Sequence, residues 1–467
     1  MSRLADRKEY RYLGCARAQT SLFMRIDHII SRESGMPAVF SRGQLTVIAL
    51  GAVISQGIIS GSGFPITVAG PAAVLSYGAA AIVAMLLMRC LSELATAHPT
   101  PGAFGSYAEA FLGRRVGFVV RSAYVLSVSG IVGTEVVMLE STLAWWRTPL
   151  PPAVMAVGVL AGINLVHLAG ERMFAWLEIA CVVIKTQALL ALIAFACHHA
   201  FGAADFSSGA VRYAAETFIQ GVQASTVWQA FSIATMGFIG LEVLSIAASQ
   251  TRASRACIGR SMRIATRLVG LLVAASVAAS AWFLAYTDVP LSNTPFLFLL
   301  EVSQVQGSKL AFEALSTVTV VSVLNCQIYG GSRILFSMAR AGQAPVMLAQ
   351  PGKLGAASSV VTLLAILVYA AYKACPNVVY VAVSSIAITA LLAIWASIFL
   401  AYFQFRRVSG DVPRGKGSWR GAVGVTVVAA IALSTLRMDA FAPTLFYGIP
   451  FLSLLAFCYP PHCNVRS

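Results

Sequence analysis

The segment that decides the fold is Gly51-Ala-Val-Ile-Ser-Gln-Gly-Ile-Ile-Ser-Gly-Ser-Gly63. It lies inside an apolar run, near 44–69, that is long enough to cross a bilayer as a helix. Yet four glycines fall within these 13 residues, and each weakens a helix by roughly 1 kcal/mol relative to alanine. Two interpretations are open. The small residues allow close helix packing, as in Gly57-x-x-x-Gly61, or the helix unwinds and presents free backbone groups to a ligand.

The composition is that of a membrane protein. The chain has 467 residues, of which 58 % are hydrophobic and only 11 % charged, and its mean hydropathy is +0.79. Soluble domains carry about 25 % charged residues, so lipid must cover much of this surface. These values exclude a cytosolic enzyme, a secreted disulfide-rich scaffold and a disordered chain. The nine cysteines form no Cys-x-x-Cys pair, so we expect no metal site, no disulfide framework and no cofactor.

The apolar runs predict twelve membrane-spanning helices. They fall near 44–69, 72–92, 116–145, 152–168, 174–199, 227–249, 264–287, 310–337, 358–372, 380–404, 421–436 and 440–458. Backbone N–H and C=O groups cannot stay unpaired in lipid, and no alternating pattern indicates a barrel. We therefore expect an all-α polytopic membrane protein.

The basic residues predict its orientation. With twelve spans and the N-terminus inside, 27 Lys and Arg side chains fall on the cytoplasmic side and five on the outer side. Such an excess is the positive-inside rule, and it explains the net charge of +15 without a nucleic-acid partner. We expect a multi-pass protein of the cell inner membrane with both termini in the cytoplasm.

Residues 1–43 are interpreted as a cytosolic tail. They contain no apolar core of the length that a secretory signal needs. The tail is either unstructured, which we favour, or it holds an amphipathic helix near Ser21–Ile30 on the membrane surface. A later start of the chain, at Met24 or Met36, is a third alternative.

A second interruption occurs in the sixth span, where Met236-Gly-Phe238-Ile-Gly240-Leu-Glu242 breaks the helical pattern. It stands five spans after the first interruption, at the matching position of a second half. A pair of interrupted helices at corresponding positions is typical of transporters built from inverted repeats, which bind substrate near the middle of the bilayer.

These features carry a family resemblance. Residues 42–71 resemble the first span of amino acid permeases in the amino acid–polyamine–organocation (APC) superfamily. Further matching motifs are Leu91-Ser-Glu93, Pro101-Gly102-Ala-Phe104-Gly-Ser-Tyr107, Glu135, Glu178-x6-Lys185, Phe238-x-Gly240-x-Glu242, Asn325-x3-Tyr329-x2-Ser332-Arg333, Gly342-Gln-Ala-Pro345, Trp395-x2-Ile398 and Phe405-Arg406-Arg407. They follow one another in order from about 42 to 407.

The resemblance implies a five-plus-five inverted repeat of the leucine-transporter type. We expect repeat 1 at 44–200, repeat 2 at 227–407, and two extra helices with a short cytosolic tail at 408–467. The chain departs from the family in having Ser55-Gln56-Gly57 in place of Gly-Thr-Gly or Gly-Ser-Gly at the first break. It also has Ala248-Ser249-Gln250 in place of Ala-Gly-Glu after the sixth span.

The substrate site is predicted at the two breaks. The start of a half-helix offers free N–H groups and a positive dipole end, which suit a carboxylate. The unwound carbonyls of the sixth span can accept from an ammonium, and Phe238 is either a lid over the substrate or part of the core. The predicted substrate-binding residues are Ser55, Gln56, Gly57, Ile58, Gly61, Met236, Phe238, Ile239 and Gly240.

Three charged residues inside the membrane are candidates for ion coupling. Glu135 and Glu242 are carboxylates in spans 3 and 6, and such residues are costly and usually functional, although each also has a structural interpretation. Lys185 lies about 16 Å into span 5, where desolvation favours the neutral amine. Its burial gives it a reason to gain and lose a proton, and the resemblance implies that it faces the first break. A static ion pair with Glu135 or Glu178 is the alternative. Glu178 is expected only to snorkel toward the interface.

We therefore expect a secondary transporter that takes up an amino acid by proton symport with alternating access, with the amino acid, the proton and the bilayer as its partners. The alternatives are an amino acid–amine exchanger and a receptor that senses an amino acid without transporting it. The shortage of acidic residues beside the breaks favours a neutral or aromatic substrate, and nothing in the sequence indicates an oligomeric state.

Overall fold

The computed structural model describes residues 24–59, 63–146, 148–202, 219, 222–252, 254–285, 306–350, 352, 354–408 and 417–460. Within these ranges the chain is almost entirely helical, and the only β-type pairing is a bridge between Phe40 and Thr251.

Ten segments of the described chain are long and apolar enough to cross a membrane. Their helices are α5 (Ala73–Ala97), α7 (Arg114–Leu143), α8 (Pro152–Ala169), α9 (Glu171–Gly202), α13 (Arg255–Ala285), α15 (Ser308–Arg340), α16 (Leu354–Ala374), α17 (Pro376–Val408), α18 (Trp419–Ser434) and α19 (Pro443–Phe457). Each overlaps one of the predicted spans. The all-α polytopic architecture is thereby confirmed, whereas the total of twelve spans stays a prediction.

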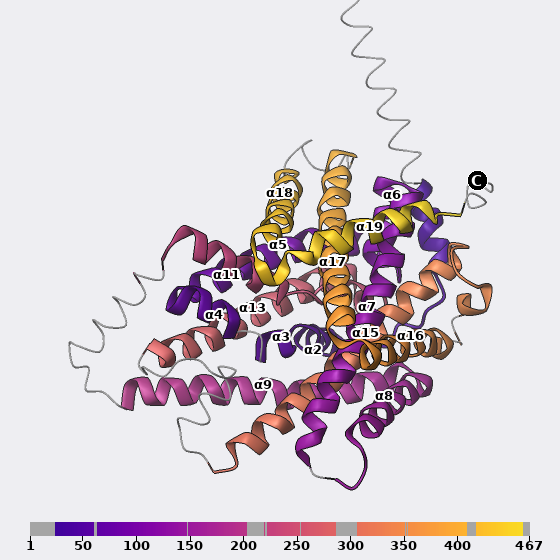
Figure 1. The fold of residues 1–467 in the computed structure, drawn as a ribbon. Helices are drawn as coiled ribbons and strands as arrows, with labels where there is room; N and C mark the ends of the chain where they lie inside the picture. Colours follow the sequence, from indigo (N-terminus) through magenta and orange to yellow (C-terminus); the bar gives the residue numbers. More distant parts are fainter. Residues whose placement is uncertain are drawn as a thin grey trace, which may run out of the picture.

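The two remaining apolar runs form interrupted helices. The first consists of α2 (Arg42–Val53), α3 (Gln56–Ile59) and α4 (Gly63–Ala69), and the second of α11 (Ala224–Met236) and α12 (Val243–Ser249). Both interruptions lie where the glycine-rich motifs predict them. Figure 1 shows α2 and α3 in the interior of the bundle, where α2 packs against α9, α12, α13 and α15.

Three long helices of the first half pack against their counterparts in the second. These pairs are α5 with α13, α7 with α15, and α8 with α16. This is the arrangement expected of an inverted repeat, because a pseudo-twofold axis brings equivalent elements together. α18 and α19 pack on the outside of this core, mainly against α17.

Two further helices lie outside the predicted spans, and the second overlaps the alternative prediction of a helix near Ser21–Ile30. α6 (Ala103–Leu112) follows α5 and packs against α7 and α17. Residues 24–33 are also helical, and Ile26 and Ile29 are buried against Ala110 of α6. The favoured prediction of an unstructured tail is therefore wrong for this part, because its apolar side chains have a partner surface that the local sequence does not reveal.

Candidate functional site

The first break is a change of backbone direction after α2. Ile54 leaves the helical conformation, with φ −71° and ψ 80°, and the Ser55 N–H donates to Val53 O. The helix resumes when the N–H groups of Ile58 and Ile59 donate to Ser55 O, at 3.0 and 3.1 Å. The carbonyls of Gly51 and Ile54 at this end of α2 can therefore accept from other donors, and they lie at the negative end of the helix dipole.

Lys185 of α9 occupies this negative end. Its fully buried Nζ donates to Gly51 O at 3.0 Å, to Ile54 O at 2.8 Å and to Ser322 Oγ at 2.7 Å. All three ammonium donors are therefore used. The arrangement joins the break in the first interrupted helix to α9 and α15 through a single side chain.

The second break is held by Glu242. Its carboxylate accepts from the Gly240 N–H, at 3.1 Å for the shorter contact, and from Trp395 Nε1 at 3.3 Å. Gly240 has φ +113°, and a Cβ there would lie 2.7 Å from Ala52 O. A side chain would disfavour this backbone and push the two broken helices apart.

A cavity of about 480 Å³ lies between the two breaks. Four predicted residues meet there, namely Ser55, Glu135, Met236 and Ile239. The other walls are largely apolar and consist of Ala52, Ile131, Val323, Gln327, Tyr380, Val381, Ser384, Ser385, Ala387, Ile388, Leu391, Ala440, Phe441 and Thr444. This volume is in the usual range for small-molecule sites.

Glu135 places an unpaired carboxylate oxygen in the wall of the cavity. Among the described residues, no hydrogen-bond partner reaches its buried Oε2 atom. Buried polar atoms almost always have such partners, so an unpaired carboxylate oxygen in a cavity wall indicates a place for a ligand or a proton.

Other predicted residues lie around the cavity rather than in its wall. Ile58 and Phe238 are each 1 % exposed and belong to the hydrophobic core. The carbonyls of Met236 and Phe238 accept within the turn, from the N–H groups of Ile239 and Leu241 at 3.1 and 3.4 Å.

The middle of the first break is only partly described. Gln56 and Gly57 belong to α3 by their backbone, and the side chain of Gln56 lies outside the described parts of the structure. Gly61 also lies outside the described residues.

The prediction that Glu178 snorkels toward the membrane interface is wrong. Its side chain is fully buried, Ser322 Oγ donates to its Oε1, and Asn325 Nδ2 donates to its Oε2 at 2.8 Å. It does not snorkel, because α15 covers this face of α9. The available signal was the seven-residue spacing from Lys185, which puts both side chains on one face of the helix.

Gln250 explains one departure from the family motif. Its backbone carbonyl accepts from the N–H groups of Val39 and Phe40, at 2.7 and 3.0 Å, and its Oε1 accepts from Tyr329 Oη at 2.6 Å. The amide thus serves as a hydrogen-bonding tie between the end of α12, the segment before α2 and α15. Gln250 is not among the residues that line the cavity.

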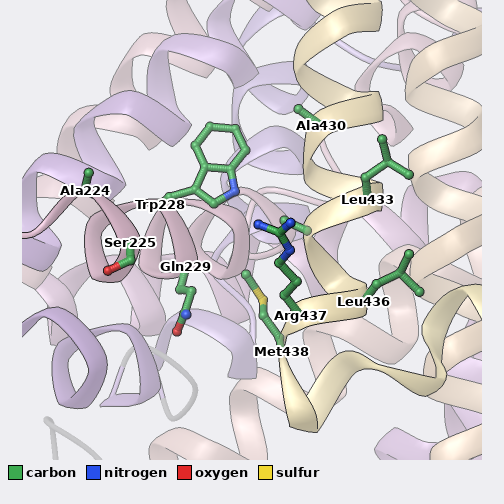
Figure 2. A pocket seen from close by; sticks show the side chains of 10 residues that line it. Ala224, Ser225, Trp228, Gln229, Ala430, Leu433, Leu436, Arg437 and Met438 are labelled. Carbon is green, nitrogen blue, oxygen red and sulfur yellow. The ribbon is translucent and has the colours of Figure 1, made fainter.

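A second cavity, of about 660 Å³, lies between the start of α11 and the end of α18 (Figure 2). Trp228, Gln229 and Arg437 point into it, and none of the predicted site residues lines it. Within the described ranges, no three His, Cys, Asp or Glu side chains lie close enough together to hold a metal ion.

The two interrupted helices, the paired halves and the cavity between the breaks define a membrane protein with the leucine-transporter fold. The solved structure of a Na⁺-coupled sialic acid symporter in its substrate-bound outward-open state has the same fold. Its TM-score is 0.58 at 10 % identity, over 90 % of this chain and 97 % of the symporter.

Residues 44–449 match the amino acid permease family, and the chain therefore belongs to that family, within the APC superfamily. It is 28 % identical to the aromatic amino acid transport protein AroP of Salmonella typhimurium over 376 residues, which is 78 % of this chain and 80 % of the relative. AroP of Escherichia coli is 27 % identical over 416 residues, or 84 % and 89 % of the two chains. The protein is thus a multi-pass amino acid permease.

Proposed function

We propose that this permease takes up an amino acid by proton symport with alternating access. The observation that carries the proposal is the position of Lys185, whose ammonium ties the end of α2 to α15 beside the cavity. A proton lost from this ammonium removes a positive charge and one N–H donor. The tie that holds the broken helix then weakens, which couples protonation to the position of α2.

The substrate is proposed to bind in the 480 Å³ cavity. Its carboxylate would meet the start of α3, where Ser55, Gln56 and Gly57 combine backbone N–H groups with the positive helix end. Its ammonium would face the turn after α11 and the unpaired oxygen of Glu135. Ile58, Gly61, Phe238 and Gly240 would shape the two breaks, and Glu242 would hold the second break open.

A neutral amino acid with a large apolar or aromatic side chain is the proposed substrate class. The walls contributed by α7, α15 and α17 are mostly aliphatic or aromatic, with Glu135 as the only carboxylate among the lining residues. A second positive charge on a substrate would lack its own partner there, at a cost of several kcal/mol. The two relatives described above carry the name of aromatic amino acid transport proteins.

The orientation and the limits of the repeats complete the proposal. The protein lies in the cell inner membrane, and both of its termini lie in the cytoplasm. Repeat 1 is 44–200, repeat 2 is 227–407, and the last two helices lie outside the transport core. A C-terminal reporter that is active only outside the inner membrane would overturn this orientation.

Purified protein in liposomes tests the proposed function. We expect radiolabelled phenylalanine to accumulate when the exterior is more acidic than the interior, and an entrapped pH dye to record proton entry with the substrate. Uptake only into liposomes preloaded with amino acid would identify an exchanger instead. Binding without any flux would identify a receptor.

A further inference from the structure

One hydroxyl group connects two buried groups of opposite charge. Ser322 Oγ accepts from Lys185 Nζ at 2.7 Å and donates its own hydrogen to Glu178 Oε1. Both α9 side chains are fully buried, as is Ser322 of α15. We propose that Ser322 and Glu178 form the path by which the proton of Lys185 leaves toward the cytoplasm, a step that rests on the proposed proton symport.

The hydrogen-bond directions fit a relay without rearrangement. The ammonium of Lys185 passes a proton to Ser322 Oγ while Ser322 passes its hydrogen to Glu178 Oε1. The products are a neutral amine, an unchanged serine and a neutral carboxyl group, so no net charge is created in the membrane. A transfer that conserves charge avoids the cost of leaving one buried ion unpaired.

The direction of the path follows from the spacing along α9. Glu178 is seven residues before Lys185, which is about 10 Å along the helix. Glu171, seven residues earlier still, is the first residue of α9, is 17 % exposed and pairs with Arg333 at 3.4 Å. Residues at intervals of seven share one face of a helix. Glu178 thus lies halfway between the coupling lysine and the proposed cytoplasmic end of α9.

Among the described titratable groups around Lys185, Glu178 interacts with it most strongly. The groups that interact electrostatically with Lys185 are Glu178 and Cys181 on α9, Cys326 on α15 and Glu135 on α7. Cys326 also interacts electrostatically with Glu178.

The other helices around α9 present few polar groups to the pair. On α8, His167 Nε2 contacts Asn325 O at 3.2 Å. α2 offers the backbone carbonyls that bind Lys185, and α13 contributes the apolar Leu272 to the packing.

Gly51 makes the close approach possible. A Cβ on this residue would overlap Oε1 of Glu178 and approach Val182. The glycine therefore lets the Glu178 carboxylate lie directly against α2, beside the carbonyl that accepts from Lys185. The relay and the break in the first interrupted helix are parts of one packed unit.

The test compares Ser322→Ala with Ser322→Thr in liposomes, where Thr retains the hydroxyl group. Glu178→Gln is the second variant, because it keeps the shape of the side chain and loses the ability to take the proton. Two rates are measured on each variant, namely phenylalanine uptake driven by a pH gradient and phenylalanine counterflow at equal pH. We expect Ser322→Ala and Glu178→Gln to lower the ratio of driven uptake to counterflow at least tenfold, and Ser322→Thr to restore it.

The outcomes separate the relay from the proposed function. If the wild type shows no substrate-linked proton entry, proton symport fails and the relay fails with it. If the wild type shows substrate-linked proton entry and the variants keep the wild-type ratio of driven uptake to counterflow, the relay alone is wrong. The same conclusion holds if impaired folding lowers both rates equally, because the ratio is then unchanged. If Glu178→Gln does not fold, the ratio for Ser322→Ala against Ser322→Thr decides the question.

Discussion

The carboxylate of Glu33 forms an ion pair with the guanidinium of Arg121 at 3.0 Å, and neither side chain is exposed to solvent. Glu33 ends the helical stretch at 24–33, and Arg121 belongs to α7. The Glu33 carboxylate also accepts from Thr100, Gly102 N, Ser106 and Ser337. The N-terminal segment is therefore a structural part of this end of the bundle, where it holds α6, α7 and α15 together.

Removal of the Glu33 carboxylate should destabilise the protein strongly. Glu33→Ala leaves the buried Arg121 without one of its two carboxylates, and breaking a buried pair costs about 3–5 kcal/mol. Thermal unfolding in detergent would measure the loss. The double variant Glu33→Ala/Arg121→Ala should lose less than the sum of the two single variants, because the residues are in contact. Simple additivity would contradict the pairing.

Glu109 should make the stability depend on pH in the acid range. Although burial raises the pKa of this α6 carboxyl, the charges of Arg121 and Arg32 outweigh it and lower the pKa to about 2. Because the pKa is lower in the folded state, ionised Glu109 stabilises the fold. This stabilisation is fully present above the unfolded pKa near 4.5 and is lost as the pH falls toward 2. The contribution is roughly 3 kcal/mol at neutral pH.

Unfolding temperatures of wild type and Glu109→Gln at pH 7 and pH 3 would measure this contribution. We expect the difference between the two proteins to shrink at the lower pH. A difference that is constant with pH would show that the carboxylate does not titrate between the folded and unfolded states as the geometry requires.

Gly240→Ala should impair transport more than expression. The φ of +113° disfavours any side chain, and the added Cβ would meet Ala52 O at 2.7 Å. We expect a loss of about 1–3 kcal/mol in stability from the strained backbone and slower uptake per folded molecule. Gly158→Ala is the matched control, since a Cβ there meets nothing within 4 Å on α8. Equal uptake by both variants would show that the second break tolerates displacement.

Phe238→Ala decides between a lid and a core residue. The ring is buried among core residues and does not line the 480 Å³ cavity in this conformation. We expect a loss of about 3–5 kcal/mol, as for other buried phenylalanines, with normal transport per folded molecule. Faster substrate leak from loaded liposomes, without a stability loss of this size, would instead support the lid.

Lys185→Met tests the coupling itself. The substitution keeps much of the side-chain length and removes the three hydrogen bonds to Gly51 O, Ile54 O and Ser322 Oγ. Substrate should still bind, which a thermal-shift assay with phenylalanine would show, and uptake should no longer respond to an imposed pH gradient. Unchanged pH-driven uptake would remove Lys185 from the coupling mechanism and favour exchange.

The helical spans and both breaks could be read from the sequence because the forces that specify them act locally. Hydropathy over about 20 residues selects a membrane helix, and glycines such as Gly51 and Gly240 weaken the helix close to the two breaks. The family motif in span 5 likewise drew attention to Lys185. None of these features depends on which helices are neighbours in the fold.

The partners of the buried charges were decided only by the tertiary structure. Lys185 reaches Ser322 across 137 positions of the chain, and Glu33 reaches Ser337 across 304. From the local sequence, Glu178 was expected to snorkel and the segment at 24–33 to be an unstructured tail. In the structure, Glu178 is buried and hydrogen-bonded, and Ile26, Ile29 and Glu33 anchor the helical segment to the interior. The physical reason is that a buried charge must find donors or acceptors somewhere, and the fold alone determines which distant side chains supply them.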